Sequence, residues 1–233
     1  MKRSRTAPLP VDAAPPAARG IKPVVRGVKL AVLGVKLAVR GVKLAVLGGP
    51  AREVRLIGGQ WKRSKLPVVD RPGLRPTPDR VRETLFNWLG ADLTGWRCLD
   101  AFAGSGALGF EAASRGATEV VLLERDPKLA QSLKASQTRL KAEALRVEAA
   151  DALVWMTRCA PASFELVLLD PPFDAAGLLS RALPLAAALV VEGGCLYVES
   201  PAALDPAQYP DGFGLFRQGR AGTVHYHLLQ RST

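Results

Sequence analysis

Short apolar runs that end in an acidic residue alternate with helical segments from residue 96 onward, and this alternation limits the possible folds. Runs such as EVVLLE and ELVLLD are typical of strands buried on both faces. Strands that alternate with helices form a parallel, doubly wound sheet. We predict strands at residues 97–102, 119–124, 146–150, 165–170, 195–200, 213–217 and 223–229, and helices at 106–115, 127–141, 151–158 and 175–190. The last two strands, joined by the polar stretch QGRAG, are expected to form an antiparallel hairpin at the edge of the sheet.

The amino-acid composition is that of a globular protein. Hydrophobic residues make up 48% of the 233 residues and charged residues 23%, which excludes a wholly disordered chain. The three cysteines, Cys98, Cys159 and Cys195, are too few and too scattered for a disulfide framework or a zinc site, and they fit a reducing cytoplasm. With only two histidines in the chain, we also expect no metal site.

Positive charge is concentrated in the N-terminal part of the chain, whose formal net charge is +11 at pH 7. Residues 1–50 contain ten Lys or Arg and one acid, residues 51–90 contain nine and four, and residues 91–233 contain 13 and 16. A basic segment beside a mildly acidic body indicates a polyanionic partner, with nucleic acid as the first candidate. A solvated basic surface would give the same pattern.

The first 50 residues do not follow the strand–helix pattern. Residues 1–20 are rich in Ala, Pro and Arg, which is typical of disorder, and GVKLAVL-type repeats follow at 27–33, 34–40 and 41–47. The repeated glycines weaken any helix by about 1 kcal/mol each. The lysines interrupt the apolar run, so we predict neither a membrane span nor a signal peptide. We expect a basic low-complexity extension, either without function or a tether for RNA or a membrane surface.

Residues 51–90 form a second basic segment. The part at 51–75 predicts a short strand, a glycine turn, a basic stretch and a loop. A helix is predicted to follow, with Thr77 as its N-terminal cap and Pro78 at its first position. The apolar face of this helix consists of Val81, Leu85, Trp88 and Leu89.

A glycine-rich loop connects the first strand of the predicted sheet to its helix. The sequence DAFAGSGALG at 100–109 contains Gly104 and Gly106 at positions where the backbone must turn tightly and approach a ligand. Such a loop at the carboxyl end of a parallel strand commonly holds a nucleotide-like cofactor. Because the G-x-G-x-x-G spacing also matches a dinucleotide fingerprint, the loop alone leaves the cofactor open.

Acidic residues follow the next two strands. Glu124 ends the second strand, where a carboxylate can accept hydrogen bonds from both ribose hydroxyls and disfavours a 2′-phosphate. Asp126 is a lesser candidate for the same contact. Asp151, at the end of the third strand, is a candidate for binding an adenine amino group, and nearly as good a candidate for capping the next helix.

The loop Asp170-Pro171-Pro172-Phe173 follows the fourth strand and is expected beside the glycine loop. Its two consecutive prolines make it stiff. A carboxylate and a backbone carbonyl here would accept the two hydrogens of an exocyclic amine, whose lone pair then points at a methyl donor. Phe173 would stack on the base. The pattern therefore favours methyl transfer to a nucleobase amine over nicotinamide chemistry.

Both loops, together with four further segments, resemble the bacterial 16S rRNA guanine-N2 methyltransferases of the D type. The further segments are RLIGGQWKRSKL (55–66), GLRPTPDRVRETLFNWL (73–89), YVES (197–200) and GTVHYHL (222–228). The resemblance covers about residues 51–233. It implies a Rossmann-like class I methyltransferase fold, S-adenosylmethionine as the cofactor, and methylation of a guanine N2 in the 16S rRNA of an assembling small ribosomal subunit. We expect a monomeric, cytoplasmic enzyme.

Candidate site residues follow from the motifs and from the resemblance. We expect the cofactor to contact Asp100, Phe102, Gly104, Ser105, Gly106, Glu124, Asp126 and Asp151. We expect Asp170, Pro171, Pro172 and Phe173 to hold the guanine as the catalytic loop. The candidate RNA contacts are Arg55, Trp61, Lys62, Arg63, Lys65, Arg75, Arg80 and Arg82. The sequence does not separate these contacts from closure of Arg75-Pro76-Thr77 over the cofactor.

The predicted organisation has three parts: an extension at 1–50, a basic segment that contacts RNA or cofactor at 51–90, and a methyltransferase domain at 91–233. Four alternative functions stay open. The enzyme could methylate an amine in DNA or a different amine in RNA, or the chain could be an RNA-binding assembly factor without activity. An NAD-linked oxidoreductase would need a hydride-site acid or base that the sequence does not reveal.

Overall fold

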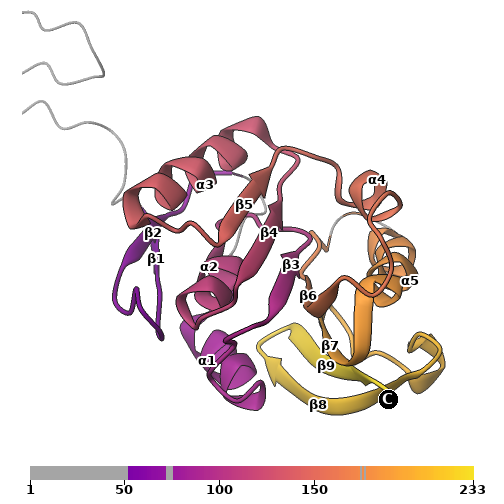
Figure 1. Cartoon of the computed structure of the whole chain (residues 1–233). Coiled ribbons are helices and arrows are strands. Elements are labelled where there is room, and N and C mark those ends of the chain that lie inside the picture. Colours follow the sequence, from indigo (N-terminus) through magenta and orange to yellow (C-terminus); the bar gives the residue numbers. More distant parts are fainter. Residues whose placement is uncertain (1–51, 72–75, 174, 176) are drawn as a thin grey trace, which may run out of the picture. The chain divides into compact units, whose positions relative to one another are not determined.

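The computed structural model describes residues 52–71, 76–173, 175 and 177–233, which belong to one compact unit, Pro50–Thr233 (Figure 1). The predicted extension at 1–50 and Arg75 lie outside the described residues. Within the described part of the chain, no helix has the length and apolarity that crossing a membrane requires.

A seven-stranded sheet forms the centre of this unit, with the strand order β5-β4-β3-β6-β7-β9-β8. The strands are β3 (Arg97–Asp100), β4 (Glu119–Leu123), β5 (Leu145–Glu148), β6 (Phe164–Leu169), β7 (Val190–Ser200), β8 (Phe213–Ala221) and β9 (Val224–Arg231). The first five in this order run parallel, and β9 pairs antiparallel with both β7 and β8. The predicted doubly wound, mostly parallel sheet with an antiparallel edge hairpin is confirmed.

Helices cover both faces of the sheet (Figure 1). They are α1 (Asp79–Trp88), α2 (Ala107–Ser114), α3 (Pro127–Leu140), α4 (Ala152–Met156) and α5 (Leu178–Leu189). Apolar side chains of α1, α2 and α3 share one core with Cys98 of β3, and those of α4 and α5 share the other core with Leu99. Neighbouring strand residues reach opposite cores because side chains alternate along a strand. The apolar runs in the sequence reflect these two cores.

A small hairpin extends the first core. Strands β1 (Glu53–Arg55) and β2 (Lys65–Pro67) pair antiparallel, and Val54, Leu56 and Leu66 from the hairpin are buried in the core that apolar residues of α1, α2 and α3 share. The β1 strand was predicted, whereas β2 lies where we expected a loop. With a single buried residue, Leu66, β2 is too short to give an alternating pattern in the sequence.

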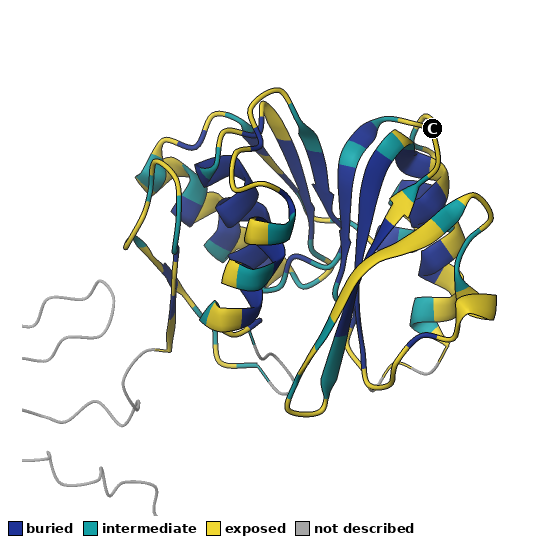
Figure 2. Ribbon diagram, turned by 90° about the horizontal axis from the view of Figure 1, so that it is seen from below, coloured by how far each residue is buried: buried dark blue, intermediate teal, exposed yellow. Residues whose placement is uncertain are grey.

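The C-terminal hairpin is longer than predicted. Strand β8 continues to Ala221, so most of the polar stretch QGRAG is strand, and the turn lies between Ala221 and Val224. Gly219 pairs with Tyr226, and a side chain at Gly219 would collide with the Tyr226 ring. The glycine therefore makes room for a cross-strand aromatic ring. Figure 2 shows that β8 is largely exposed along the outer edge of the sheet.

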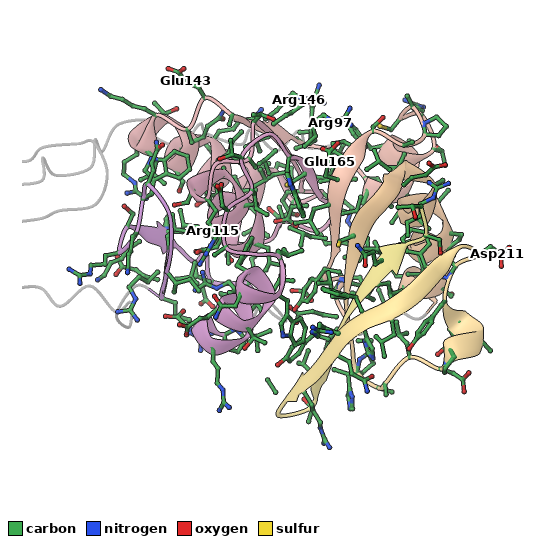
Figure 3. The ribbon with its side chains drawn as sticks, turned by 60° about the horizontal axis from the view of Figure 1, so that its bottom comes forward. Arg97, Arg115, Glu143, Arg146, Glu165 and Asp211 are labelled. Carbon is green, nitrogen blue, oxygen red and sulfur yellow. The ribbon has the colours of Figure 1, made fainter. Side chains whose placement is uncertain are left out.

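The amino ends of the strands carry structural ion pairs. Arg97 at the start of β3 donates to Glu165 of β6 across 2.7 Å, and the two side chains lie together in Figure 3. Its neighbour Cys98 is buried in the sheet. The candidate site residues instead follow the carboxyl ends of the strands, so this ion pair is outside the candidate site.

Candidate active site

The carboxyl ends of β3 and β6 form the centre of the candidate site. The strand order reverses between these two strands, since β4 and β5 lie on one side and β7 on the other. In open α/β sheets, ligands bind outside the carboxyl ends at such a switch point. The Ala101 amide donates to the Leu168 carbonyl across 3.1 Å, which ties the glycine loop to the strand that precedes Asp170. The predicted proximity of the two loops is confirmed.

The glycine loop needs its glycines for different physical reasons. Gly104 and Gly106 have φ values of 52° and 79°, in the left-handed region. At Gly106, a Cβ atom would also come within 2.6 Å of Leu133. Gly109 has an ordinary φ, but a Cβ there would lie 3.0 Å from Asp100 Oδ2, to which the Gly109 amide donates across 2.9 Å. The loop thus brings the start of α2 directly against the end of β3.

Glu124 follows β4 and faces this loop. Its Oε2 atom accepts from the Gly104 amide across 2.9 Å, and its Oε1 atom accepts from the Asp126 amide across 2.7 Å. Burial raises the pKa of Glu124, although these amide hydrogen bonds lower it in part. The half-buried carboxylate therefore lies beside the glycine loop, at the position where the sequence predicts a ribose contact.

The other two acidic candidates cap helices. Asp126 Oδ1 accepts from the Lys128 amide at the start of α3, and Asp126 also pairs with Arg71 across 3.0 Å. Asp151 Oδ1 accepts from the Val154 amide at the start of α4. Capping was one of the two interpretations of Asp151 that the sequence left open. The second oxygen of Asp126 pairs with Arg71, whereas the second oxygen of Asp151 accepts no hydrogen bond from a described residue. Both cofactor assignments stay predictions.

Asp170 belongs to a chain of polar side chains that comes from three parts of the sequence. The Thr77 hydroxyl lies 3.0 Å from Glu199 Oε1 and 3.4 Å from Asp170 Oδ2. The Tyr197 hydroxyl donates to the same Glu199 oxygen across 2.9 Å. The prediction that Thr77 caps α1 is wrong: Pro78 occupies the cap position, and the Thr77 side chain turns to the carboxylates instead.

Four carboxyl groups, those of Asp100, Glu124, Asp170 and Glu199, lie at this edge of the sheet and are wholly or partly buried. Burial raises the pKa of Asp100 to about 7, and the Glu124 carboxylate adds to that rise. Burial, the Glu199 carboxylate and the Asp100 carboxylate raise the pKa of Asp170 well above its usual value, and burial also raises that of Glu199. Such a cluster favours a positively charged ligand, because a cation would relieve the repulsion.

A cavity of about 560 Å³ opens next to Asp170. It is lined by Pro171, Pro172 and Phe173, by residues of α5, by Glu199 at the end of β7 and by the loop that follows β7. Its walls are mainly apolar, and its size is typical of a small-molecule site. Phe173 is 42% exposed, so part of its side chain is available to a ligand.

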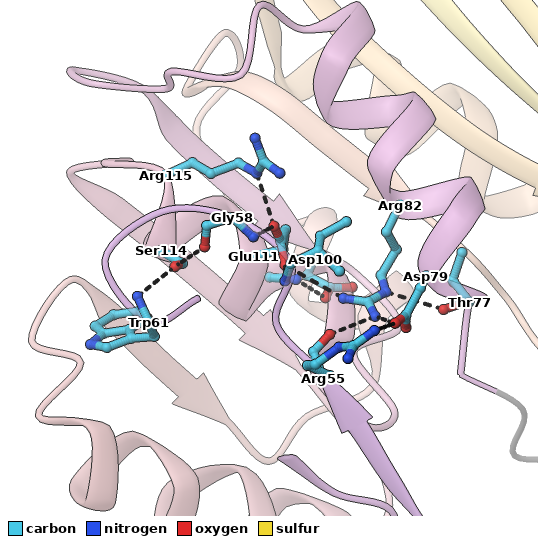
Figure 4. Close-up of polar contacts among 12 residues, drawn as sticks. Arg55, Gly58, Trp61, Thr77, Asp79, Arg82, Asp100, Glu111, Ser114 and Arg115 are labelled. Atoms are coloured by element: carbon cyan, nitrogen blue, oxygen red, sulfur yellow. Dashed lines mark hydrogen bonds and ion pairs between the residues drawn. The ribbon is translucent and has the colours of Figure 1, made fainter. Parts of the chain in front are cut away.

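The structure corrects the assignment of Arg82. Its side chain is fully buried, so it cannot contact a phosphate as the sequence predicted. The guanidinium pairs with Asp79 across 2.6 Å and with Glu111 of α2 across 3.4 Å, and it donates to the carbonyls of Arg55 and Thr77 (Figure 4). Arg82 thus joins the small hairpin to α1 and α2 and fixes the backbone at Thr77.

Five other basic candidates are exposed and remain available to a polyanion: Arg55, Lys62, Arg63, Lys65 and Arg80. Arg55 and Lys65 form exposed ion pairs with Asp79 and Glu53. Exposed pairs of this kind contribute little stability, so a phosphate can displace the acid. Trp61 is partly buried against the core of the hairpin side.

Two residues of the site, Tyr197 and Glu199, were not predicted as site residues from the sequence, and Thr77 was considered only as part of a segment that closes over the cofactor. The available signal was positional, because Glu199 is an acid near the carboxyl end of a buried strand, as Asp100, Glu124 and Asp170 are. Tyr197 is fully buried with a polar atom that needs a partner. Within the described residues, no cluster of three metal-ligating side chains occurs.

The chain matches known proteins over the whole described unit. It matches the family described as conserved hypothetical protein 95 over residues 54–230. It is 43% identical over 181 residues to the ribosomal RNA small subunit methyltransferase D of Escherichia coli, which covers 77% of this chain and 90% of that protein. The solved structure of the putative methyltransferase yhhF from Escherichia coli matches with a TM-score of 0.69 and 40% identity, over 78% of this chain and 99% of that one.

A more distant solved structure carries bound ligands. The 16S rRNA N2 methyltransferase RsmC of T. thermophilus, in complex with AdoMet and guanosine, matches with a TM-score of 0.58 and 26% identity, over 78% of this chain and 50% of that one. Fold, sequence and family match agree on one class of protein. The chain therefore belongs to the family of the ribosomal RNA small subunit methyltransferase D, and it is a ribosomal RNA methyltransferase with a Rossmann-like fold.

Proposed function

We propose that this enzyme transfers a methyl group from S-adenosylmethionine to the exocyclic N2 of a guanine in 16S rRNA. The observation that carries the proposal is the position of Asp170. It follows β6 at the switch point, and it lies between the carboxylates around the glycine loop and an apolar cavity of about 560 Å³. The RsmC match, a 16S rRNA N2 methyltransferase crystallised with AdoMet and guanosine, supports both the donor and the base.

The residues around the glycine loop fit this cofactor. Gly104 and Gly106 allow the left-handed backbone turns of the loop, and Glu124 presents a carboxylate that can accept from ribose hydroxyls. Burial and the neighbouring carboxylates raise the pKa values of Asp100 and Asp170, and a positively charged ligand would offset this repulsion. The cofactor brings a sulfonium cation and an ammonium group, and it supplies the methyl group. We assign cofactor contacts to Asp100, Phe102, Gly104, Ser105, Gly106 and Glu124, with Asp126 and Asp151 as secondary contacts.

The catalytic loop orients the amine. The nitrogen lone pair of a guanine N2 is delocalised into the ring, so the amine is a weak nucleophile. The carboxylate of Asp170 and a carbonyl of the proline pair would accept its two hydrogens and direct the lone pair at the methyl group. Phe173, with its exposed ring, would stack on the base.

The RNA is expected to approach along the basic segment that precedes the domain. Arg55, Lys62, Arg63, Lys65 and Arg80 are exposed on the hairpin and on α1, and Trp61 offers a partly exposed ring. Phosphate contacts of this kind position the nucleic acid without reading its sequence. We propose an assembling small subunit as the substrate and a monomeric enzyme.

The test is methyl transfer from labelled S-adenosylmethionine to three substrates: small subunits that lack the modification, naked 16S rRNA and duplex DNA. Mass spectrometry of the digested product identifies the nucleoside. We expect N2-methylguanosine from the subunit or its rRNA, and loss of that product with Asp170→Ala, whose cofactor binding should be retained.

The alternatives give different results. N6-methyladenine in DNA, without any RNA product, would refute the proposed substrate while keeping an amine as the acceptor. Cofactor binding without transfer to any of the three substrates would refute the proposal in favour of a binding protein.

A further inference from the structure

We propose that Glu199 reads the Watson–Crick edge of the target base: its carboxylate accepts a hydrogen bond from N1–H and thereby selects guanine. The inference rests on the proposed function, because it names how the guanine is recognised. It concerns a residue that lies 29 positions after Asp170 in the sequence and that approaches the same cavity from a different strand.

Glu199 is placed to meet the ring of the base. It lines the cavity together with Pro171, Pro172 and Phe173, although the residue is only 3% exposed. The remaining walls are mostly apolar, with several prolines that offer flat surfaces. A mostly apolar cavity with one acidic residue in its lining suits a planar ring that has hydrogen-bond donors on one edge.

The Glu199 carboxylate is held by one oxygen. Oε1 accepts from both the Thr77 hydroxyl, across 3.0 Å, and the Tyr197 hydroxyl, across 2.9 Å. Oε2 accepts no hydrogen bond from any described residue. It is also not one of the fully buried side-chain atoms that lack a hydrogen-bond partner. A carboxylate that is held through one oxygen, on a residue that lines the cavity, is a pre-oriented acceptor.

The chemistry of the base edge explains the selectivity. Guanine presents N1–H and the N2 amine as donors on its Watson–Crick edge, whereas adenine presents an unprotonated N1 acceptor between its other groups. A carboxylate attracts N1–H and repels an N1 lone pair. A site built to hydrogen-bond a substrate N–H discriminates strongly against the analogue that lacks it, because the buried acceptor is then left unpaired.

The two carboxylates then have separate tasks on one base. Asp170 accepts from the reacting N2 amine, and Glu199 accepts from the neighbouring N1–H. The Thr77 hydroxyl lies within 3.4 Å of both carboxylates and therefore helps to fix their positions relative to each other. Two neighbouring carboxylates suit the base edge, where the two donor nitrogens N1 and N2 are bonded to the same carbon, C2.

The test compares two bases that both carry a 2-amino group. Small-subunit particles are reconstituted with 16S rRNA that has either guanine or 2,6-diaminopurine at the methylated position. The diaminopurine keeps the N2 amine but has an unprotonated N1. The wild-type enzyme should prefer guanine by about 100-fold in kcat/KM. Glu199→Gln keeps an oxygen for Thr77 and Tyr197 but presents an amide donor in place of the second oxygen. It should lower kcat/KM on guanine by about 100-fold. It should also reduce the preference for guanine over 2,6-diaminopurine by at least about 10-fold.

The matched control is Glu192→Gln, the same chemical change at an exposed position near the start of β7, which should alter neither value. Cofactor binding measured by calorimetry should be the same in all three enzymes. An equal loss on both bases with Glu199→Gln, or no loss on either, would overturn the role of Glu199 while leaving the proposed function intact. A wild-type enzyme that forms no N2-methylguanosine would overturn both.

Discussion

The substitution Asp100→Asn should remove a pH-dependent loss of stability that the active site imposes on the fold. Asp100 is 2% exposed, and its carboxyl has a pKa of about 7 instead of 3.8, mainly because of burial. Between these two values the folded chain holds a proton that the unfolded chain has released. The stability that this proton provides is present at low pH, and it is lost as the pH rises toward 7.

The size of the effect follows from the pKa. Between about pH 5 and pH 7 the folded protein holds this proton and the unfolded protein does not, so each of these roughly two pH units lowers the free energy of unfolding by about 1.4 kcal/mol. Above that range both forms have released the proton, and the loss is complete. The wild-type free energy of unfolding should therefore fall by about 3 kcal/mol through Asp100 alone. An asparagine keeps an oxygen for the Gly109 amide but cannot ionise. It also removes one charge that raises the pKa of Asp170, which acts in the same direction.

The measurement is urea unfolding without cofactor at about pH 5 and pH 8.5, followed by the fluorescence of the four tryptophans. The fall in free energy between the two pH values should be about 3 kcal/mol larger in the wild type than in Asp100→Asn. The exposed Asp211→Asn serves as the control and should follow the wild type. The same pH dependence in all three proteins would refute the argument that Asp100 is protonated in the free enzyme.

Three further perturbations test other parts of the site. Glu124→Ala should weaken binding of S-adenosylmethionine by about 1–3 kcal/mol in calorimetry, because a carboxylate that accepts hydrogen bonds is lost. The exposed Glu143→Ala should leave binding unchanged, and equal affinities of the two variants would place the ribose contact at another residue. Arg82→Met should lower the free energy of unfolding in urea by about 3–5 kcal/mol, because Glu111 loses a buried cation. Arg80→Met on the exposed face of α1 should change it by less than about 0.5 kcal/mol, and similar values for both variants would contradict the stabilising role of the buried Arg82 contacts. Deletion of residues 1–50 should leave the melting temperature and methyl transfer unchanged because the family match begins at residue 54, and lost activity in a folded protein would reveal a tether.

The architecture was predictable because the same physical cause acts throughout the sheet. A strand with helices on both faces needs apolar side chains on both sides, as in Val120 and Val121, which enter opposite cores. The sequence therefore contains continuous apolar runs that mark the strands. The acids after these runs mark the carboxyl ends, where a doubly wound sheet binds its ligands. The two loops that define the site, at Asp100 and Asp170, could be found in this way.

Contacts between distant segments could not be predicted, and they decide the details of the site. Arg82 was grouped with RNA-binding residues by its charge, yet it lies on the same face of α1 as the buried Val81 and Leu85. That position, among apolar residues at helical spacing, was the signal for a buried ion pair. Thr77 and Glu199 are 122 residues apart, and no local pattern relates them. Their pairing exists only after β7 has joined the sheet beside β6.

The place of β9 in the sheet has a consequence for self-association. Although β9 follows β8 in the chain, it lies between β8 and β7, so β7 is covered only as long as β9 stays paired. β7 ends in the buried run CLYVES. Without β9, this strand would present unpaired backbone amides and carbonyls between apolar side chains. Detachment of the hairpin would therefore release the strand that carries Glu199 and would expose an edge on which one molecule can pair with the next.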